Sequence, residues 1–213
     1  MKHNTRIIAI SNQKGGVGKT TTAINLAASL AMADRTVLLV DLDPQSNLTS
    51  GVGLKAEPGP GPTVYQALTA EVAPDPAGFA VASGVTGMYL IPADQNLTGA
   101  ELELVGALQR ESRLRHFLQQ ARGRYDYIFI DTPPSLGLLT LNALVAADSV
   151  LIPLNCEYFA LEGLAELMAT MGRVQSGLNP GLHIEGVLLT MADARTRLGK
   201  QVAGEVRTHF EGK

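Results

Sequence analysis

The sequence predicts an α/β fold with a doubly wound, mostly parallel sheet and helices on both faces. Three observations predict it: apolar runs typical of buried strands alternate with helical patterns, a glycine-rich loop joins the first such strand to the first helix, and acidic residues end two strands. The alternation implies right-handed crossovers. With 213 residues, 46% of them hydrophobic, the chain can bury one substantial core, so we expect a single domain over residues 1–213.

The first strand, residues 7–10, leads into a glycine-rich loop, and an Ala- and Leu-rich helix follows as far as Ala33. Glycines remove the Cβ atoms that keep a backbone away from a polyphosphate, so successive N–H groups can converge on its oxygens. The N-terminus of the helix adds a favourable dipole. The loop therefore predicts a nucleoside triphosphate site with seven binding residues, which are Gly15, Gly16, Val17, Gly18, Lys19, Thr20 and Thr21.

Individual side chains of this loop have predicted roles. Lys19 is expected to reach the β- and γ-phosphates, the Thr20 hydroxyl to coordinate Mg²⁺, and Thr21 to bond the α-phosphate. The usual phosphate-loop pattern begins with Gly, whereas Gln13 stands there in this chain and a second lysine, Lys14, follows it. The alternative is a glycine-rich turn that carries two surface lysines.

The second strand, residues 36–40, is a nearly continuous apolar run that ends in Asp41 and Asp43. Ligands of open α/β sheets gather at the carboxyl ends of the strands, so these acids are expected beside the phosphate loop. We assign to Asp43 the role of general base or water orienter. A solvated acidic turn is the alternative.

Residues 46–94 are the least informative part of the chain and predict a surface connection. The segment 57–62 is rich in Pro and Gly and predicts an exposed loop, 64–70 a short helix, and 88–91 a strand. The alternative is a partner-binding surface on the flank of a dimer.

Residues 98–122 have a helical pattern, and two sets of apolar residues predict two buried faces. The first set is Leu102, Val105 and Leu108, and the second is Leu114, Phe117 and Leu118. Thr98 is predicted to cap this segment, with Glu101 at the capping-box position.

An aromatic and β-branched strand over residues 125–130 ends in Asp131. A carboxylate at that position can hold a Mg²⁺-bound water beside Thr20. A structural aspartate that caps the following helix is the alternative. Further along the chain, residues 149–154 predict a strand, 160–176 a helix and 184–190 a strand.

Five segments resemble one known family. The octet 14–21 resembles the deviant Walker A loop of the ParA/MinD ATPases, and residues 41–45 and 131–136 are similar to the acidic strand end and switch II of that family. Residues 157–164 and 189–196 are similar to chromosomal, Soj-like ParA proteins. The resemblance implies a P-loop NTPase fold and a Mg²⁺-dependent ATPase that hydrolyses ATP to ADP and phosphate during chromosome or plasmid segregation.

The resemblance also implies roles and partners. Lys14 would act in a homodimer that sandwiches ATP, reaching the phosphates bound by the other subunit, while Asp43 positions the attacking water. Basic residues near the C-terminus, Arg195, Arg197 and Lys200, would bind DNA without sequence preference, and a ParB-type centromere-binding protein would stimulate hydrolysis and release the dimer. An ordinary charged loop is the alternative for the basic residues. Family members continue beyond the length of this chain with a base-contacting segment and a final strand or helix, which we expect to be lacking.

Composition limits the other classes of protein to which the chain could belong. The net charge of −3 gives no global preference for nucleic acid, and one cysteine, Cys156, excludes an internal disulfide framework. No signal peptide or membrane span is visible, so the expected location is cytoplasmic and nucleoid-associated. A MinD-like membrane-positioning ATPase would need an amphipathic C-terminal helix, and residues 202–210 suggest no strong apolar face. A metabolic P-loop enzyme of cofactor biosynthesis would need a small-substrate pocket.

Overall fold

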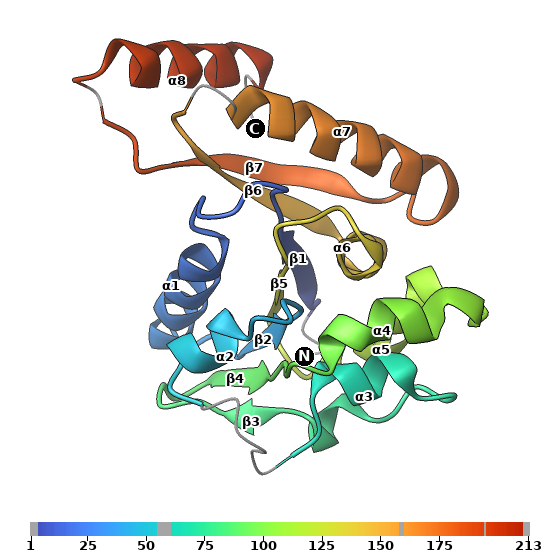
Figure 1. Cartoon of the computed structure of the whole chain (residues 1–213). Helices are drawn as coiled ribbons and strands as arrows, with labels where there is room; N and C mark the ends of the chain where they lie inside the picture. Colours follow the sequence, from blue (N-terminus) through green and yellow to red (C-terminus); the bar gives the residue numbers. More distant parts are fainter. Residues whose placement is uncertain (1–3, 55–60, 158–159, 194, 211–213) are drawn as a thin grey trace.

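A computed structural model describes residues 4–54, 61–157, 160–193 and 195–210, and one seven-stranded sheet runs through them (Figure 1). The strands lie in the order β3-β4-β2-β5-β1-β6-β7, and all neighbours are parallel except β3, which is antiparallel to β4. Their bounds are β1 Arg6–Ile10, β2 Val37–Asp41, β3 Val81–Ala82, β4 Met88–Ile91, β5 Tyr127–Asp131, β6 Ser149–Asn155 and β7 His183–Thr190. The predicted mostly parallel sheet is confirmed.

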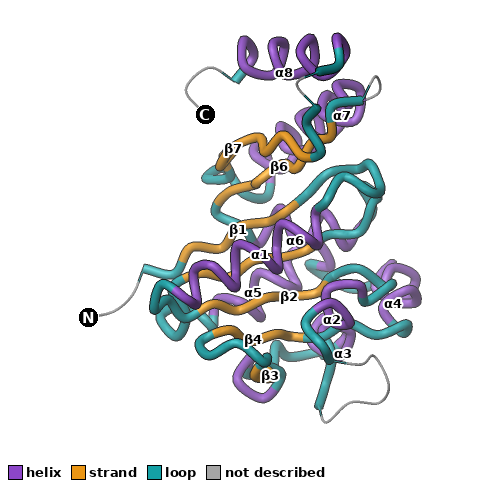
Figure 2. Tube along the Cα trace, turned by 90° about the vertical axis from the view of Figure 1, so that its left-hand side faces the viewer, coloured by secondary structure: helices purple, strands orange, loops and turns teal. Residues whose placement is uncertain are grey.

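Helices cover both faces of the sheet, as expected for a doubly wound fold (Figures 1 and 2). The α-helices are α1 Lys19–Met32, α2 Asn47–Gly51, α3 Val64–Thr69, α4 Leu97–Glu103, α5 Arg113–Gln119, α6 Leu138–Ala146, α7 Ala160–Gly177 and α8 Arg197–His209. Three short 3₁₀ turns are η1 Pro76–Gly78, η2 Leu104–Gly106 and η3 Arg110–Ser112. One core cluster includes residues of α1 and α2, and the other includes residues of α3 to α8.

The central strand β1 shows why the phosphate loop emerges where it does. Ile7 and Ala9 belong to one core cluster and Ile8 and Ile10 to the other, because successive side chains of a strand point to opposite faces. On either side of β5, Ile10 of β1 and Asp41 of β2 both align with Asp131. The ends of three neighbouring strands therefore bring the loop and the acidic residues to one edge.

The prediction that the first set of apolar residues in the segment 98–122 forms a buried face is wrong. Leu102, Val105 and Leu108 are 79%, 62% and 87% exposed, whereas Leu97, Ala100 and Leu104 are buried. The segment is not one helix, because it breaks into η2 and η3, and Gln109 between them has a φ of 53°. An interrupted helix does not keep the 3.6-residue period on which the prediction depended.

The second predicted face is confirmed, since Leu114, Phe117 and Leu118 are fully buried in α5. The predicted cap is wrong. Asn96 holds the N-cap position of α4, and the Glu101 carboxylate instead accepts a hydrogen bond of 3.3 Å from the Leu139 N–H.

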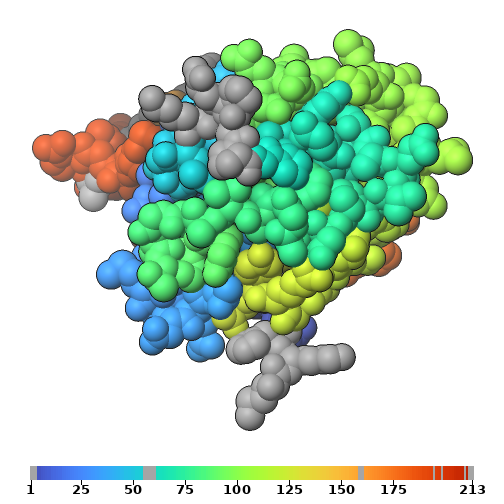
Figure 3. Space-filling model, turned by 90° about the horizontal axis from the view of Figure 1, so that it is seen from below, coloured from blue at the N-terminus to red at the C-terminus, as the bar shows by residue number. Residues whose placement is uncertain are grey.

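Part of the expected loop at residues 57–62 lies outside the described residues, as do Tyr158, Phe159 and Ala194 in segments that carry the family resemblance. Seen from below, the residues of α3 lie beside those that follow α4 (Figure 3). Over the ranges that the structure describes, no helix combines the length and apolar character needed to cross a membrane.

Candidate nucleotide site

The phosphate loop joins β1 to α1 at the carboxyl edge of the sheet. Gly16 and Gly18 have φ angles of +72° and +86°, and Gly18 is the N-cap of α1. Side chains rarely adopt this left-handed region, so glycine suits both positions. A Cβ on Gly15 would lie 3.8 Å from Pro134, which places the segment after β5 directly against the loop. The predicted order of strand, glycine loop and helix is confirmed.

Lys19 opens α1 and is only 7% exposed. Its Nζ donates a hydrogen bond of 3.1 Å to the carbonyl of Lys14. Burial lowers the pKa of Lys19, and the nearby carboxylates of Asp131 and Asp43 only partly oppose that effect. An ammonium group with too little negative charge around it suits a phosphate ligand.

Thr20 and Asp131, the two predicted magnesium residues, are in contact. The Thr20 hydroxyl donates a hydrogen bond of 2.6 Å to Oδ2 of Asp131. Burial raises the pKa of Asp131 to about 7, although the Thr20 hydroxyl and Lys19 act in the opposite direction. A nearby cation would stabilise the ionised form of a carboxylate that is buried in this way. This is the environment expected of a residue that holds a Mg²⁺-bound water.

Buried polar atoms without a partner gather at this edge of the sheet. Among the described residues they are Ser11 Oγ, Gln13 Oε1, Ser46 Oγ, Asp131 Oδ1 and Asn155 Oδ1. Buried polar atoms normally find hydrogen-bond partners, so this concentration marks the place of a polar ligand and its waters. No three-residue cluster of metal-binding side chains occurs in the described part of the chain. Mg²⁺ usually takes one or two protein groups plus water and phosphate, and the residues present fit Mg²⁺ with a nucleotide.

The two acids that end β2 have different environments. Asp41 is fully buried and accepts hydrogen bonds of 2.8 and 2.6 Å from the N–H and hydroxyl of Thr49, and burial raises its pKa to about 6. Asp43 is 7% exposed, accepts a hydrogen bond of 3.0 Å from the Gln45 N–H, and interacts electrostatically with Lys19. Asp41 therefore holds α2 in place, whereas the Asp43 carboxylate bonds within its own turn.

Lys14 does not join Lys19 inside the loop. Its Nζ forms an ion pair with the Glu157 carboxylate, whose side chain is 62% exposed, and its N–H donates to Oδ1 of Asn12 at 3.0 Å. The ion pair lowers the pKa of Glu157. Sequence reasoning did not identify Glu157 as this partner, because the two residues are 143 positions apart.

The basic residues near the C-terminus lie on the surface at the start of α8. Arg195 is 90% exposed on its side chain and pairs with Asp193 at 2.8 Å. Arg197 and Lys200 are exposed and three residues apart in the first turn of α8, so they share one side of the helix. Arg195, Arg197 and Lys200 are thus close in sequence, and the carboxylate of Asp193 offsets the charge of Arg195.

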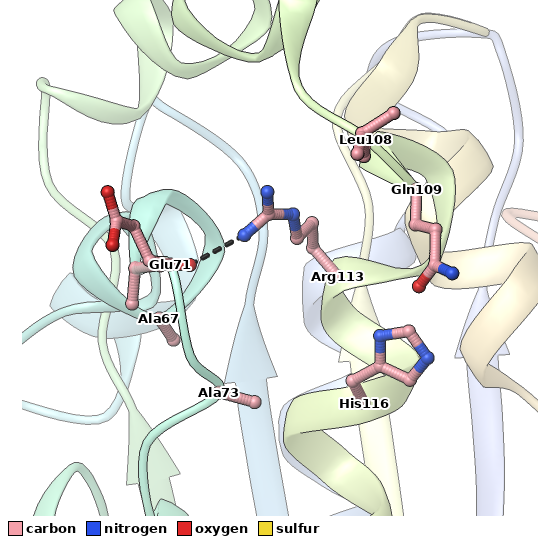
Figure 4. Close-up of a pocket in the computed structure, with 8 residues that line it drawn as sticks. Ala67, Glu71, Ala73, Leu108, Gln109, Arg113 and His116 are labelled. Atoms are coloured by element: carbon pink, nitrogen blue, oxygen red, sulfur yellow. Dashed lines mark hydrogen bonds between the residues drawn. The ribbon is translucent and has the colours of Figure 1, made fainter.

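A pocket of about 480 Å³ lies between α3 and the region of η3 and α5 (Figure 4). Arg113 crosses it and donates a hydrogen bond of 2.6 Å to the Ala70 carbonyl. None of its lining residues belongs to the phosphate loop. This pocket is therefore separate from the nucleotide site.

Comparison with known proteins gives a family. The sequence pattern of the AAA domain family AAA_31 matches residues 5–184. The chain is 57% identical over 212 residues to the chromosome partitioning protein ParA of Myxococcus xanthus, covering 97% of this chain and 72% of that protein. It is 54% identical over 209 residues to the sporulation initiation inhibitor protein Soj of Bacillus subtilis, covering 98% of this chain and 81% of that protein.

A solved structure agrees with this relationship. The structure named as cobyrinic acid a,c-diamide synthase from Mycobacterium smegmatis, with ADP and magnesium bound, is 42% identical and superposes with a TM-score of 0.89. The match covers 97% of this chain and 83% of that one. Since the family pattern spans residues 5–184 and the ParA and Soj relatives named above are 57% and 54% identical, this chain belongs to the ParA/MinD family of P-loop ATPases and is similar to its ParA and Soj members.

Proposed function

We propose that the chain is an ATP-dependent partition ATPase that helps to segregate chromosome or plasmid DNA. The observation that carries this proposal is the arrangement of two lysines in one loop, with Lys19 buried and Lys14 held outside by Glu157. An outward lysine is available to a second subunit, as the deviant Walker A resemblance implies. We also infer that residues 1–213 act as one ATPase domain, because a single sheet unites the elements.

The proposed chemistry uses residues of this chain in defined roles. Lys19 and the N–H groups of the loop offset phosphate charge, and Thr20 with Asp131 holds Mg²⁺ and its water. Bound Mg²⁺ supplies further charge neutralisation on the phosphates. Asp43 orients the attacking water or accepts its proton, and Lys14 from the second subunit adds positive charge when two ATP-bound copies associate.

The proposed cycle has three partners: a second copy of the chain, DNA and a ParB-type centromere-binding protein. The ATP-bound dimer would bind DNA through Arg195, Arg197 and Lys200, and the ParB-type protein would stimulate hydrolysis and release it. The positive end of the α8 dipole lies beside Arg197 and Lys200 and adds to the attraction for phosphate. We therefore expect a cytoplasmic protein associated with the nucleoid.

The decisive experiment measures ATP hydrolysis with and without non-specific DNA and a ParB-type partner. We expect Asp43→Ala to bind ATP and dimerise but to hydrolyse it at least tenfold more slowly, and Lys14→Ala to bind ATP without dimerising. Glu166→Ala, at an exposed acid of α7, is the control. Hydrolysis by Asp43→Ala at the wild-type rate would show that the assignment of Asp43 is wrong.

Salt dependence tests the DNA surface. Each phosphate contact contributes about 0.9 to the slope of log K against log salt concentration for duplex DNA, so Arg197→Ala and Lys200→Ala should each reduce the slope by about one. Arg124→Ala removes an exposed arginine that pairs with Asp75 and should leave the slope unchanged. DNA binding that is insensitive to salt would contradict the proposal.

A metabolic function is the second candidate, because the Mycobacterium smegmatis structure bears an enzyme name. Adding cobyrinic acid to the same assay separates the two, since a partition ATPase should not respond to it. A MinD-like membrane function is less consistent with α8, because Val202, Val206 and the C-cap residue Phe210 are buried in the core. The expectation that residues 202–210 have no strong apolar face is therefore wrong. Sedimentation with liposomes tests the membrane alternative.

A further inference from the structure

The carbonyl of Val17 requires a partner inside the protein. A peptide unit is planar and trans, so the C=O of Val17 and the N–H of Gly18 point in opposite directions. An N–H that faces a phosphate therefore directs the preceding carbonyl away from the ligand. Val17 is fully buried, so its carbonyl needs a hydrogen bond from within the fold.

Thr190 supplies that hydrogen bond. Its hydroxyl donates to the Val17 carbonyl at 2.9 Å, across 173 residues of sequence. The Cγ2 methyl of the same side chain lies 3.6 Å from the point where a Cβ on Gly18 would stand. One side chain thus bonds Val17 and lies beside Gly18, the two residues of a single peptide unit in the phosphate loop.

Thr190 is also the last residue of β7, which lies two places from β1 in the sheet. Met191 follows with a φ of +49°, and Thr196 caps α8 by accepting a hydrogen bond of 3.1 Å from the Gly199 N–H. Thr190, which bonds the phosphate loop, therefore comes shortly before Arg197, the first residue of α8, in the sequence.

We propose that Thr190 is a positioning residue, which holds the Val17–Gly18 peptide so that the Gly18 N–H faces the phosphate. Because Thr190 ends β7, occupancy of the loop should also alter the hydrogen exchange of the residues that follow it, 191–193 and 195–200. This inference rests on nucleotide binding at the loop and is independent of the dimer, DNA and ParB-type steps of the proposed function.

The test compares two variants of Thr190 for affinity towards a non-hydrolysable ATP analogue with Mg²⁺, measured by calorimetry. Thr190→Val keeps the shape and removes the hydroxyl, so affinity should fall about three- to tenfold. Thr190→Ser keeps the hydroxyl and should bind within about twofold of wild type. The control is Thr69→Val, because Thr69 is another half-buried threonine whose hydroxyl donates to a carbonyl, that of Tyr65 at 3.0 Å.

Hydrogen exchange of residues 191–200 provides the second readout. Nucleotide should change the exchange of this segment in wild type and Thr190→Ser, and the change should be lost in Thr190→Val. A purely structural threonine would lower the melting temperature in Thr190→Val while affinity and the nucleotide-dependent exchange stayed at wild-type values, which would overturn the inference. Failure of the wild type to bind the analogue would instead overturn the proposed function together with it.

Discussion

Lys14 and Lys19 belong to the same loop but have different environments. Lys19 is buried with its ammonium on the Lys14 carbonyl, and Lys14 reaches outward to Glu157. Burial lowers the pKa of Lys19, which means that the charged side chain is less stable in the fold than in water. Nucleotide-free protein therefore keeps a charge that a phosphate would stabilise.

From this environment we predict that Lys19→Met stabilises the nucleotide-free protein. Removing an undercompensated buried charge while keeping a long side chain should raise the free energy of unfolding by about 1 kcal/mol. Urea denaturation without nucleotide measures this change. The same variant should lose the rise in melting temperature that Mg²⁺ and an ATP analogue cause in wild type.

The matched control for this prediction is Lys200→Met, at an exposed lysine of α8. It should change stability by less than about 0.5 kcal/mol and should keep the response to nucleotide. If Lys19→Met proves less stable than wild type without nucleotide, attraction to Asp131 and Asp43 outweighs the desolvation of Lys19.

At the scale of elements, strands were more predictable than the helices around them. The strands β1, β2 and β5 are buried on both faces, so they appear in the sequence as continuous apolar runs, and β2 and β5 end in an acid. The predicted position of Asp43 and Asp131, beside the phosphate loop, agrees with their electrostatic interaction with Lys19 in the structure. The segment 98–122 was misread because its helix breaks at η2 and η3, and a sequence period cannot reveal such a break.

Contacts between distant residues set the other limit on prediction. Glycine loops have a local signature, whereas the ion pair of Lys14 with Glu157 and the bond from Thr190 to Val17 join segments 143 and 173 residues apart. Whether two such side chains meet depends on strand order, which puts β6 and β7 beyond β1. The sequence predicted the existence of these strands but not that order.

Helix α8 provides a prediction for an element. Val202, Val206 and the C-cap residue Phe210 recur every four residues and are 3%, 4% and 7% exposed. Figures 1 and 2 both show α8 next to α7. Val206→Ala should therefore lower the free energy of unfolding by about 2 kcal/mol in urea denaturation. Thr208→Ala, at an exposed position of the same helix, should cost less than about 0.5 kcal/mol. Equal effects of the two variants would mean that α8 is not packed through this stripe.

At the scale of the whole molecule, the sheet brings acids from β2 and β5 together. Asp41 and Asp131 align directly across the two strands. Burial is the largest cause that raises the pKa of both carboxyl groups; the charge of Asp43 also raises both, and the charge of Asp41 also raises the pKa of Asp131. A carboxyl group whose pKa is higher in the folded than in the unfolded state binds more protons when folded. The free energy of unfolding of the nucleotide-free protein should therefore fall as the pH rises from the usual carboxyl pKa of 3.8 towards the folded values of about 6 for Asp41 and about 7 for Asp131.

We predict that Asp41 contributes measurably to this fall. Its pKa rises from 3.8 to about 6 on folding, so its ionisation should lower the free energy of unfolding by about 2 kcal/mol between pH 4.5 and 7.5. Urea denaturation of nucleotide-free protein across that range measures the slope, and Asp41→Asn should flatten it by this amount even though the loss of Thr49 bonds destabilises the variant at every pH. Thr208→Ala, which removes no ionisable group and lies at an exposed position, should keep the wild-type slope. A full wild-type slope in Asp41→Asn would mean that burial at the end of β2 does not control this carboxylate, and that the pH dependence arises elsewhere in the sheet.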